Sequence, residues 1–312
     1  MGRESIPKPA PDRTKEIRRS SMPETKQASQ TIAFQGVPGA YSDLACREAY
    51  PEMATLFCPS FEDVLDAVNG GQAALAMIPA ENSVAGRVAE IHHLLPHTEL
   101  HIIAEHFQRV NHQLLALKEA TTEGLKTIHS HVHALSQCRK LIRELGLEAV
   151  VCADTAGAAA EVAEGGDKTQ AAIASFLAGE IYGLEALRSN IEDAEHNTTR
   201  FLVLAREPFN PDPAKGAVIT SFVFYVRNVP AAVYKALGGF ATNGVNMTRL
   251  ESFMIDGTFT QAQFYADIEG HPDEPAVKLA FEDLNHYSRE VKILGSYYAH
   301  PFRHIEKTAS GS

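Results

Sequence analysis

The sequence of 312 residues lacks the features that membrane, nucleic-acid-binding and metal-binding proteins need. No apolar run approaches the ~20 residues that span a bilayer. The formal net charge of -11 argues against a nucleic-acid partner, because phosphates demand clustered lysine and arginine. The four cysteines lie far apart and form no Cys-x-x-Cys pair, which argues against both a zinc site and a disulfide framework.

Residues 1–30 differ in composition from the rest of the chain. Pro, Lys, Arg, Ser and Glu dominate this segment and leave almost nothing to bury, so we expect a disordered tail. A targeting peptide is the less favoured alternative, because acidic residues such as Glu4, Asp12 and Glu16 interrupt it. We recognise no secretory signal, and together with the unpaired cysteines this predicts the reducing cytoplasm.

A strand followed by a helix is the recurring pattern between residues 31 and 175. Five repetitions predict a mostly parallel sheet with right-handed crossovers, in which ligands bind at the carboxyl ends of the strands. The first turn has glycines at 36 and 39 before a helix, which suits an anion, but it lacks the G-x-G-x-x-G spacing of a dinucleotide site. The expected strands are 31–34, 73–78, 127–129, 149–152 and 171–174.

Polar side chains follow these expected strands. Ser42, Glu81, Asn82, Ser130 and Thr155 all sit where a strand ends, so we expect them to converge on one region. The alternative for each Ser or Thr taken singly is a helix N-cap, and Ser130 is the expected cap of the helix that follows it.

The segment Asn197 to Phe201 holds an amide, two hydroxyls and a fixed positive charge immediately before an apolar stretch. This pattern predicts a polar cluster at the mouth of a buried strand. Arg200 can clamp a carboxylate through its planar fork, and Thr199 can offer a hydroxyl proton beside it. The alternative is a cap and a surface salt bridge.

Histidines alternate at His129, His131 and His133, a spacing that would place them on one face of a strand. A helix capped by Ser130 would break this period, and no carboxylate or thiol accompanies the histidines in sequence. We therefore expect no metal here.

The pattern changes after a proline-rich linker at 208–217. Alternating apolar residues and helical spacings follow each other in the order βαββαβ, the ferredoxin-like split unit, and Asp256-Gly257 suits a hairpin turn. Small sheets of this kind pair at their edges, which predicts a homodimer or a dimer of dimers. The expected strands are 218–226, 245–253, 259–268 and 291–298, and the expected helices are 233–241, ending at Asn243-Gly244, and one opening at Pro275.

Five segments occur in a fixed order along the chain. They are Gly36-x-x-Gly39-Ala40-Tyr41-Ser42, Pro79-Ala80-Glu81-Asn82-Ser83, Ser130-His131 through Gln137-Cys138, Asp154-Thr155-Ala156, and Asn197-x-Thr199-Arg200-Phe201. These segments resemble the prephenate dehydratase family, and the βαββαβ region resembles its ACT regulatory domain. The resemblance implies an α/β fold: a two-lobed catalytic domain at 31–207, similar to periplasmic binding proteins, with a cleft between its lobes. The ACT domain would cover 218–301 and a tail 302–312.

The resemblance implies decarboxylating dehydration of prephenate to phenylpyruvate, a step toward phenylalanine, without a cofactor or metal. Thr199 would donate or relay a hydrogen bond to the leaving hydroxyl, with Glu81 as the alternative acid, and Asn82 and Gln137 would orient the ring and its carboxylates. The remaining substrate contacts would be Arg200, Ser130, Tyr41, Ser42, Ser83, Thr155, Asn197 and Phe201.

Phenylalanine is the effector that the resemblance implies, bound between ACT domains. The family's Pro-Gly-Ala-Leu is Pro230-Ala231-Ala232-Val233 here, and its Glu-Ser-Arg-Pro is Glu251-Ser252-Phe253-Met254, so the contacts differ. Arogenate dehydratase and a non-catalytic amino-acid sensor are the alternative functions. The expected effector contacts are Ala231, Ala232, Val233, Asn243, Asn246, Leu250, Glu251 and Ser252.

Overall fold

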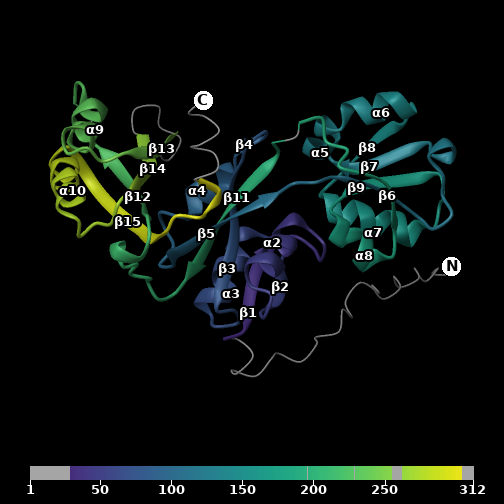
Figure 1. Cartoon of the computed structure of the whole chain (residues 1–312), viewed down its shortest axis with the longest axis horizontal. Coiled ribbons are helices and arrows are strands. Elements are labelled where there is room, and N and C mark those ends of the chain that lie inside the picture. Colours follow the sequence, from purple (N-terminus) through teal and green to yellow (C-terminus); the bar gives the residue numbers. More distant parts are fainter. Residues whose placement is uncertain (1–28, 195, 228, 255–261, 304–312) are drawn as a thin grey trace, which may run out of the picture.

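Three sheets with their helices lie in a row along the longest axis of the molecule (Figure 1). This computed structural model describes residues 29–194, 196–227, 229–254 and 262–303. Most of the two predicted tails, namely residues 1–28 and 304–312, and the predicted hairpin turn Asp256-Gly257 lie outside the described residues. None of the helices in the described ranges is long and apolar enough to cross a lipid bilayer.

The central sheet, lobe 1, is built from the start of the chain and from one late strand. In the order β2-β1-β3-β11-β5, β1 runs parallel to β2 and β3, whereas β11 is antiparallel to both of its neighbours. The elements of lobe 1 are β1 (Thr31–Gln35), α2 (Tyr41–Ala49), β2 (Ala54–Cys58), α3 (Phe61–Asn69), β3 (Leu75–Asn82), β4 (Gly86–Arg87), α4 (Ala89–Leu94), β5 (His101–Arg109) and β11 (Thr198–Ala205).

A second sheet, lobe 2, is inserted between β5 and β11. Its order is β10-β6-β9-β7-β8, with β7, β8 and β9 parallel and β6 and β10 antiparallel additions. The elements are β6 (Gln113–Ala116), η1 (Thr122–Gly124), β7 (Thr127–His131), α5 (Val132–Gln137), α6 (Arg139–Leu145), β8 (Glu148–Cys152), α7 (Thr155–Gly165), β9 (Gln170–Ala174), α8 (Phe176–Tyr182) and β10 (Glu185–Ser189).

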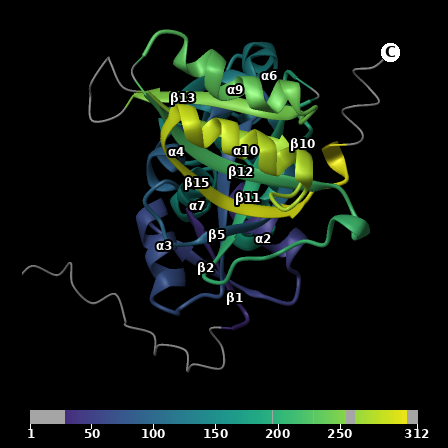
Figure 2. The same ribbon diagram turned by 90° about the vertical axis from the view of Figure 1, so that its left-hand side faces the viewer.

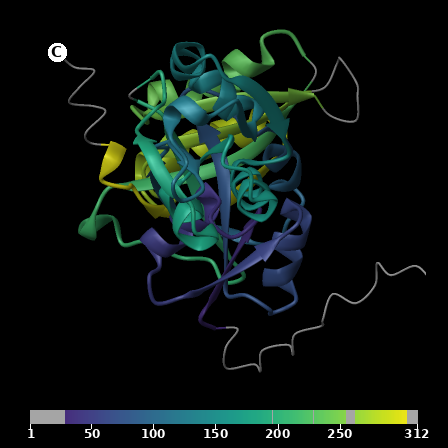
Figure 3. The same ribbon diagram turned by 90° about the vertical axis from the view of Figure 1, so that its right-hand side faces the viewer.

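The chain therefore passes from lobe 1 to lobe 2 after β5 and returns before β11, so the two-lobed α/β fold is confirmed (Figure 1). Figure 3 shows the molecule from the side on which lobe 2 lies. The sheets are mixed and not mostly parallel, because β5, β6, β10 and β11 pair antiparallel to their neighbours.

The predicted N-cap at Ser130 is wrong. Ser130 lies inside β7, fully buried, and its hydroxyl donates to the carbonyl of Ile173 in the neighbouring strand at 2.7 Å. The helix that follows is capped instead by His131, whose ring accepts the N–H of His133 at 3.3 Å. The strand runs two residues farther than expected because this internal hydrogen bond satisfies the buried hydroxyl.

The C-terminal domain has the predicted βαββαβ order, with sheet order β13-β14-β12-β15 and both helices on one face (Figure 2). The first helix ends before Asn243 and Gly244, whose φ of +69° suits glycine, and the second opens at Pro275 as expected. The elements are η2 (Pro213–Lys215), β12 (Val218–Val226), α9 (Ala232–Thr242), β13 (Met247–Met254), β14 (Ala262–Glu269), α10 (Pro275–Tyr287) and β15 (Ser288–Tyr298).

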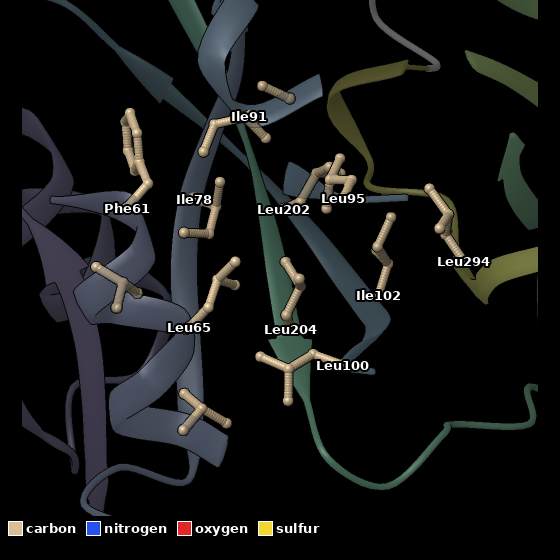
Figure 4. Close-up of a cluster of buried hydrophobic side chains, with 14 of the residues drawn as sticks. Phe61, Leu65, Ile78, Ile91, Leu95, Leu100, Ile102, Leu202, Leu204 and Leu294 are labelled. Atoms are coloured by element: carbon tan, nitrogen blue, oxygen red, sulfur yellow. The ribbon is translucent and has the colours of Figure 1, made fainter. Parts of the chain in front are cut away.

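The other face of this sheet packs on lobe 1. Ile102 and Leu204 of lobe 1 share one hydrophobic cluster with Ile219 and Leu294 of the C-terminal domain, all at most 1% exposed (Figure 4). A side chain at position 295 would collide with the backbone of Ile102, so Gly295 allows β15 to approach β5 closely. The two domains therefore share a core and do not merely touch.

The C-terminal segment also packs onto lobe 1. Phe302 stacks on Phe107 with ring centres 4.8 Å apart, and Arg303 bonds to both oxygens of Glu105 at 2.6 and 2.8 Å. These two positions, placed in a tail by the sequence pattern, are thus part of the interface.

Replacing Leu204 by alanine tests this shared core. Leu204 is fully buried, so we expect the substitution to reduce the free energy of unfolding by about 2–5 kcal/mol through lost contacts and a cavity. Urea unfolding followed by circular dichroism measures the change. The matched control is Leu279→Ala on α10, which is 51% exposed and should stay within about 0.5 kcal/mol of wild type. Equal losses in both variants would contradict the shared core.

Candidate active site

Two segments connect the lobes, one between β5 and β6 and the other between β10 and β11, and they run side by side. We call them the two crossovers. The N–H of Val110 donates to the carbonyl of Asn197 at 2.9 Å, and the N–H of Ile191 donates to the carbonyl of His112 at 3.1 Å. The N–H of His112 donates to the carboxylate of Glu192 at 2.9 Å. Polar residues of both crossovers are therefore held together at the lobe junction.

Four side chains from distant parts of the chain form a continuous hydrogen-bonded series there. The amide nitrogen of Asn82 donates to Thr199 Oγ1 at 2.9 Å and to Asn197 Oδ1 at 2.8 Å. Asn197 Nδ2 then donates to Gln137 Oε1 at 2.8 Å. The side-chain oxygen Oδ1 of Asn82 accepts hydrogen bonds from two backbone N–H groups of the following turn, at 2.8 and 3.0 Å. These bonds fix the orientation of the side-chain amide.

The series continues through a histidine that the sequence pattern did not single out. His112 Nε2 donates to Gln137 Oε1 at 2.9 Å, and its Nδ1 lies 3.0 Å from the hydroxyl of Tyr41. That hydroxyl also lies 2.9 Å from the carbonyl oxygen of Asn111. The sequence signal for His112 is its place directly before β6, in the segment that connects β5 to β6. That place becomes meaningful once the connection between the lobes is known. We call Tyr41, Asn82, His112, Gln137, Asn197 and Thr199 the polar network.

Burial determines the protonation states of His112 and Tyr41 in the polar network. Desolvation lowers the pKa of His112 from its ordinary value, although Gln137 and Glu192 oppose the change. Desolvation also raises the pKa of Tyr41 well above its ordinary value, and the charge of Glu192 adds to the effect. His112 is therefore neutral and Tyr41 keeps its proton at neutral pH.

Thr199 and Arg200 point to opposite faces of β11, because side chains alternate along a strand. Thr199 pairs with Asn82 of β3 and faces the lobe junction, whereas Arg200 pairs with Glu81 and faces the C-terminal domain. The sequence pattern placed Glu81 and Arg200 in one cluster with Thr199. The structure corrects this, since it separates them by the thickness of the sheet.

Arg200 is bound entirely within the protein. Its guanidinium is 3% exposed and donates to Glu105 at 2.8 Å, Asp267 at 2.6 Å and the hydroxyl of Tyr297 at 2.9 Å. Glu81 lies 3.2 Å from the same guanidinium, and its other oxygen is ion-paired with Arg249. This geometry does not offer Arg200 to a substrate carboxylate, contrary to the expectation from sequence.

Several other residues that were expected to contact the substrate bond or pack within the protein. Ser83 Oγ donates to the carbonyl of His196 at 2.5 Å and accepts the N–H of Thr198 at 3.0 Å, so it braces the entry to β11. Phe201 is buried in the core beneath α2. Ser42 is buried in α2, Ser130 is bonded within lobe 2, and Thr155 opens α7.

The glycine turn before α2 contacts lobe 2. Its Gly39 N–H donates to the carboxylate of Asp43 at 2.9 Å, so this donor is not free for an anion. The Ser175 hydroxyl donates to the Gly39 carbonyl at 2.6 Å. A Cβ at Gly39, whose φ is +87°, would lie 2.7 Å from the Cα of Ala178. Glycine is required here because two helices of different lobes meet at this point.

A cavity of about 220 Å³ lies beside the polar network. Gln137 and Asn197 form part of its wall, together with His133, Glu192 and Asp193. A second cavity, of about 270 Å³, lies at the junction with the C-terminal domain and is lined by Glu81, Asn82, Ser83, Phe107, Thr198, Arg200, Thr248, Arg249, Asp267, Phe302 and Arg303. In the described ranges, no three His, Cys, Asp or Glu side chains gather as a metal site would require.

The expected effector contacts are spread over the C-terminal domain. Glu251 is ion-paired with Arg87 of lobe 1 at 3.5 Å and with Arg249 of its own strand at 3.6 Å. Asn243 ends α9 and bonds its own helix, and Asn246 donates to Glu269 at 3.1 Å. The others lie at the start of α9 (Ala231, Ala232 and Val233) and on β13 (Leu250 and Ser252).

Known proteins resemble this chain over most of its length. A bifunctional N-acyl-homoserine lactone acylase/prephenate dehydratase from Komagataeibacter europaeus is 53% identical over 87% of this chain and 97% of its own. The arogenate dehydratase/prephenate dehydratase 1 of Arabidopsis thaliana is 36% identical over 85% of this chain and 71% of its own.

The fold agrees with solved structures. A prephenate dehydratase from Arthrobacter aurescens in complex with L-Phe has a TM-score of 0.79 at 28% identity, covering 90% of this chain and 97% of its own. The family model for prephenate dehydratase matches residues 32–209. With the two lobes and the polar network in place, these matches show that the chain belongs to the prephenate dehydratase family.

Proposed function

We propose that the chain converts prephenate to phenylpyruvate at the lobe junction, and that the polar network performs the reaction. The observation that carries this proposal is the unbroken series of hydrogen bonds from Thr199 through Asn82, Asn197 and Gln137 to His112. It joins side chains of both lobes in a chain whose family is a family of carbon–oxygen lyases.

The reaction requires two bonds to break and one proton to be delivered. The bond from the ring to its carboxylate breaks and releases carbon dioxide, and its electron pair enters the ring. The ring carbon–oxygen bond breaks at the same time, and the hydroxyl takes a proton and leaves as water. Because the ring becomes aromatic, the protein has mainly to position the substrate and polarise the leaving group.

The hydrogen bonds determine what Thr199 can do. Asn82 donates to Thr199 Oγ1, so the hydroxyl proton of Thr199 points away from Asn82 and is available to the leaving hydroxyl. A threonine hydroxyl is too weak an acid to protonate unaided, so it acts as a positioned donor or relay. Among the described residues, none accepts a hydrogen bond from Gln137 Nε2, which is therefore free to donate to a carboxylate in the adjoining cavity.

The geometry gives little support to Glu81 as the alternative acid or to Arg200 as a contact for a substrate carboxylate. Both are engaged on the face of the sheet that meets the C-terminal domain. We therefore assign donation to Thr199, orientation of the substrate to Asn82, Gln137 and Asn197, and support of Gln137 to neutral His112.

Prephenate is the substrate we favour over arogenate, whose only difference is an ammonium group in place of the ketone. The name of the Komagataeibacter relative refers to prephenate as a substrate, whereas the name of the Arabidopsis relative refers to both arogenate and prephenate. We propose phenylalanine as the effector, supported by the related enzyme with L-Phe bound. A homodimer or dimer of dimers and a cytoplasmic location complete the proposal, and the four free cysteines support the latter.

The acylase activity named for the Komagataeibacter relative is not part of our proposal. Thr127 Oγ1 lies 3.0 Å from His129 Nε2, a contact between a hydroxyl and an imidazole. Within the described part of the chain, however, no carboxylate bonds the other ring nitrogen of His129, as a nucleophile activated by a triad would require.

The Thr199→Ala variant tests the proposed function. We expect kcat for phenylpyruvate formation to fall about 10²–10³-fold, because one donor to the departing group is lost. The matched control is Thr199→Ser, which keeps the hydroxyl and should retain most of the activity. Absorbance of phenylpyruvate is followed with prephenate as substrate, with and without phenylalanine, and formation of phenylalanine is measured separately with arogenate as substrate. Unchanged kcat in Thr199→Ala would contradict the assignment, and no turnover by wild type would contradict the function.

The neutral state of His112 predicts how stability depends on pH. Its pKa is lowered in the folded protein, so the unfolded chain binds more protons as the pH falls below the unfolded value of about 6.5. Stability should therefore fall between pH 7 and pH 5. His92, whose pKa burial lowers to about 4, contributes in the same direction.

Urea unfolding midpoints of wild type and His112→Gln at pH 7 and pH 5 measure this effect. We expect a shallower loss in His112→Gln, because that variant retains only the contribution of the other buried histidines. An identical loss in both proteins would show that His112 is not held neutral by the fold.

A further inference from the structure

Strand β11 carries the reacting hydroxyl on one face and a buried guanidinium on the other. Thr199 and Arg200 are neighbours in sequence and pair with Asn82 and Glu81 of β3. The pairing with β3 shifts by one residue immediately after Arg200, whereas the pairing with β5 is regular from Thr198 to Val203. The register with β3, the strand that carries Asn82, is therefore interrupted next to Thr199 and Arg200.

Arg200 is anchored by the C-terminal domain and by lobe 1 together. Asp267 of β14 accepts from its Nη1 at 2.6 Å, and the hydroxyl of Tyr297 of β15 accepts from its Nη2 at 2.9 Å. Glu105 of lobe 1 accepts from Nε at 2.8 Å. The three nitrogens of the guanidinium are thus held in three directions, which fixes its position and its plane.

Asp267 is itself rigidly held. It is fully buried, and its second oxygen accepts from the hydroxyl of Ser221 at 2.5 Å. Ser221 in turn bonds Tyr297 at 2.7 Å and accepts from Tyr265 at 3.2 Å. Burial alone would raise the pKa of Asp267, but the charges of Arg200 and Arg303 and the hydrogen bonds from Ser221 and Arg200 together outweigh it. The pKa is therefore lowered and the carboxylate stays charged.

We propose that Asp267 is a positioning residue for the dehydratase reaction, which fixes β11 through Arg200 and so holds the Thr199 hydroxyl against Asn82. Tyr297 contributes to the same positioning, because its hydroxyl accepts the hydrogen bond from Nη2 of Arg200. The inference rests on the proposed function only in giving Thr199 its role in the reaction. It means that the C-terminal domain completes the catalytic geometry of lobe 1 without touching the substrate.

Asp267→Asn and Tyr297→Phe test the inference against a matched control. We expect kcat to fall about 10–100-fold in Asp267→Asn, since small misplacements of a reacting group have effects of this size. KM should change little, because neither residue touches the substrate. The control is Lys292→Met, which removes two other bonds between the same domains, to the carbonyls of Pro96 at 2.9 Å and Thr98 at 2.7 Å. Its kcat should stay within about twofold of wild type.

A double-variant comparison separates positioning from general loosening of the fold. If Asp267 acts through Thr199, then Asp267→Asn should have little further effect on kcat in the Thr199→Ala background. The inference is overturned if the two losses multiply, or if Lys292→Met loses as much activity as Asp267→Asn.

Hydrogen exchange supplies a readout that does not depend on activity. The backbone amides of residues 197–203 should exchange faster in Tyr297→Phe than in wild type. In Lys292→Met their exchange rate should equal that of wild type. Because Tyr297→Phe removes only a hydroxyl, it carries the test even where Asp267→Asn does not fold. Inactive wild-type protein would refute the proposed function, whereas unaltered exchange at 197–203 in Tyr297→Phe would refute the anchoring role.

Discussion

A guanidinium buried with carboxylates from two domains is the interaction on which this structure depends. Moving Arg200, Glu105 and Asp267 out of water costs several kcal/mol per ion, and only close mutual pairing with further hydrogen bonds offsets that cost. Arg200 belongs to lobe 1, but Asp267 belongs to the C-terminal domain. The pairing is therefore complete only while the two domains are docked, which makes docking and the conformation of β11 interdependent.

The apolar surroundings make this interaction specific. The cluster that joins Leu204 and Ile102 to Ile219 and Leu294 lies at the same interface. The side chains of Arg200, Glu105 and Asp267 are at most 3% exposed there, so their charges are satisfied mainly by one another. Gly295 permits the close approach of β15 to β5 that the hydrogen bonds require. Packing and electrostatics thus select the same arrangement of the domains.

On its other face β11 contributes to a network that is polar but uncharged. Neutral His112 and protonated Tyr41 terminate a series of amides that begins at Asn82, whose orientation is fixed by two backbone donors. Such a network can orient a substrate and its leaving hydroxyl with little reorganisation. Because the network spans both lobes, its geometry requires that the glycine turn of lobe 1 meets α8 of lobe 2 closely, as Gly39 allows.

Local patterns predicted much of this molecule. Alternation and helical spacing gave the βαββαβ order, the capping residues after α9 and the opening of α10 at Pro275, because each depends on neighbours in the chain. The order of the motifs predicted that Tyr41, Asn82, Gln137, Asn197 and Thr199 belong to one site, and the structure brings these residues together. Ser130 was misassigned, because only the neighbouring carbonyl of Ile173 distinguishes a buried strand serine from a helix cap.

The sequence by itself determined which residue types are available and in which local elements they lie. Only the tertiary structure decided that Thr199 and Arg200 serve different faces of one strand, and that His112 joins the polar network. Strand alternation separates adjacent residues, whereas the return of β11 between β3 and β5 brings together residues more than a hundred positions apart. Contacts of that kind depend on the packing of distant segments, which no local pattern encodes.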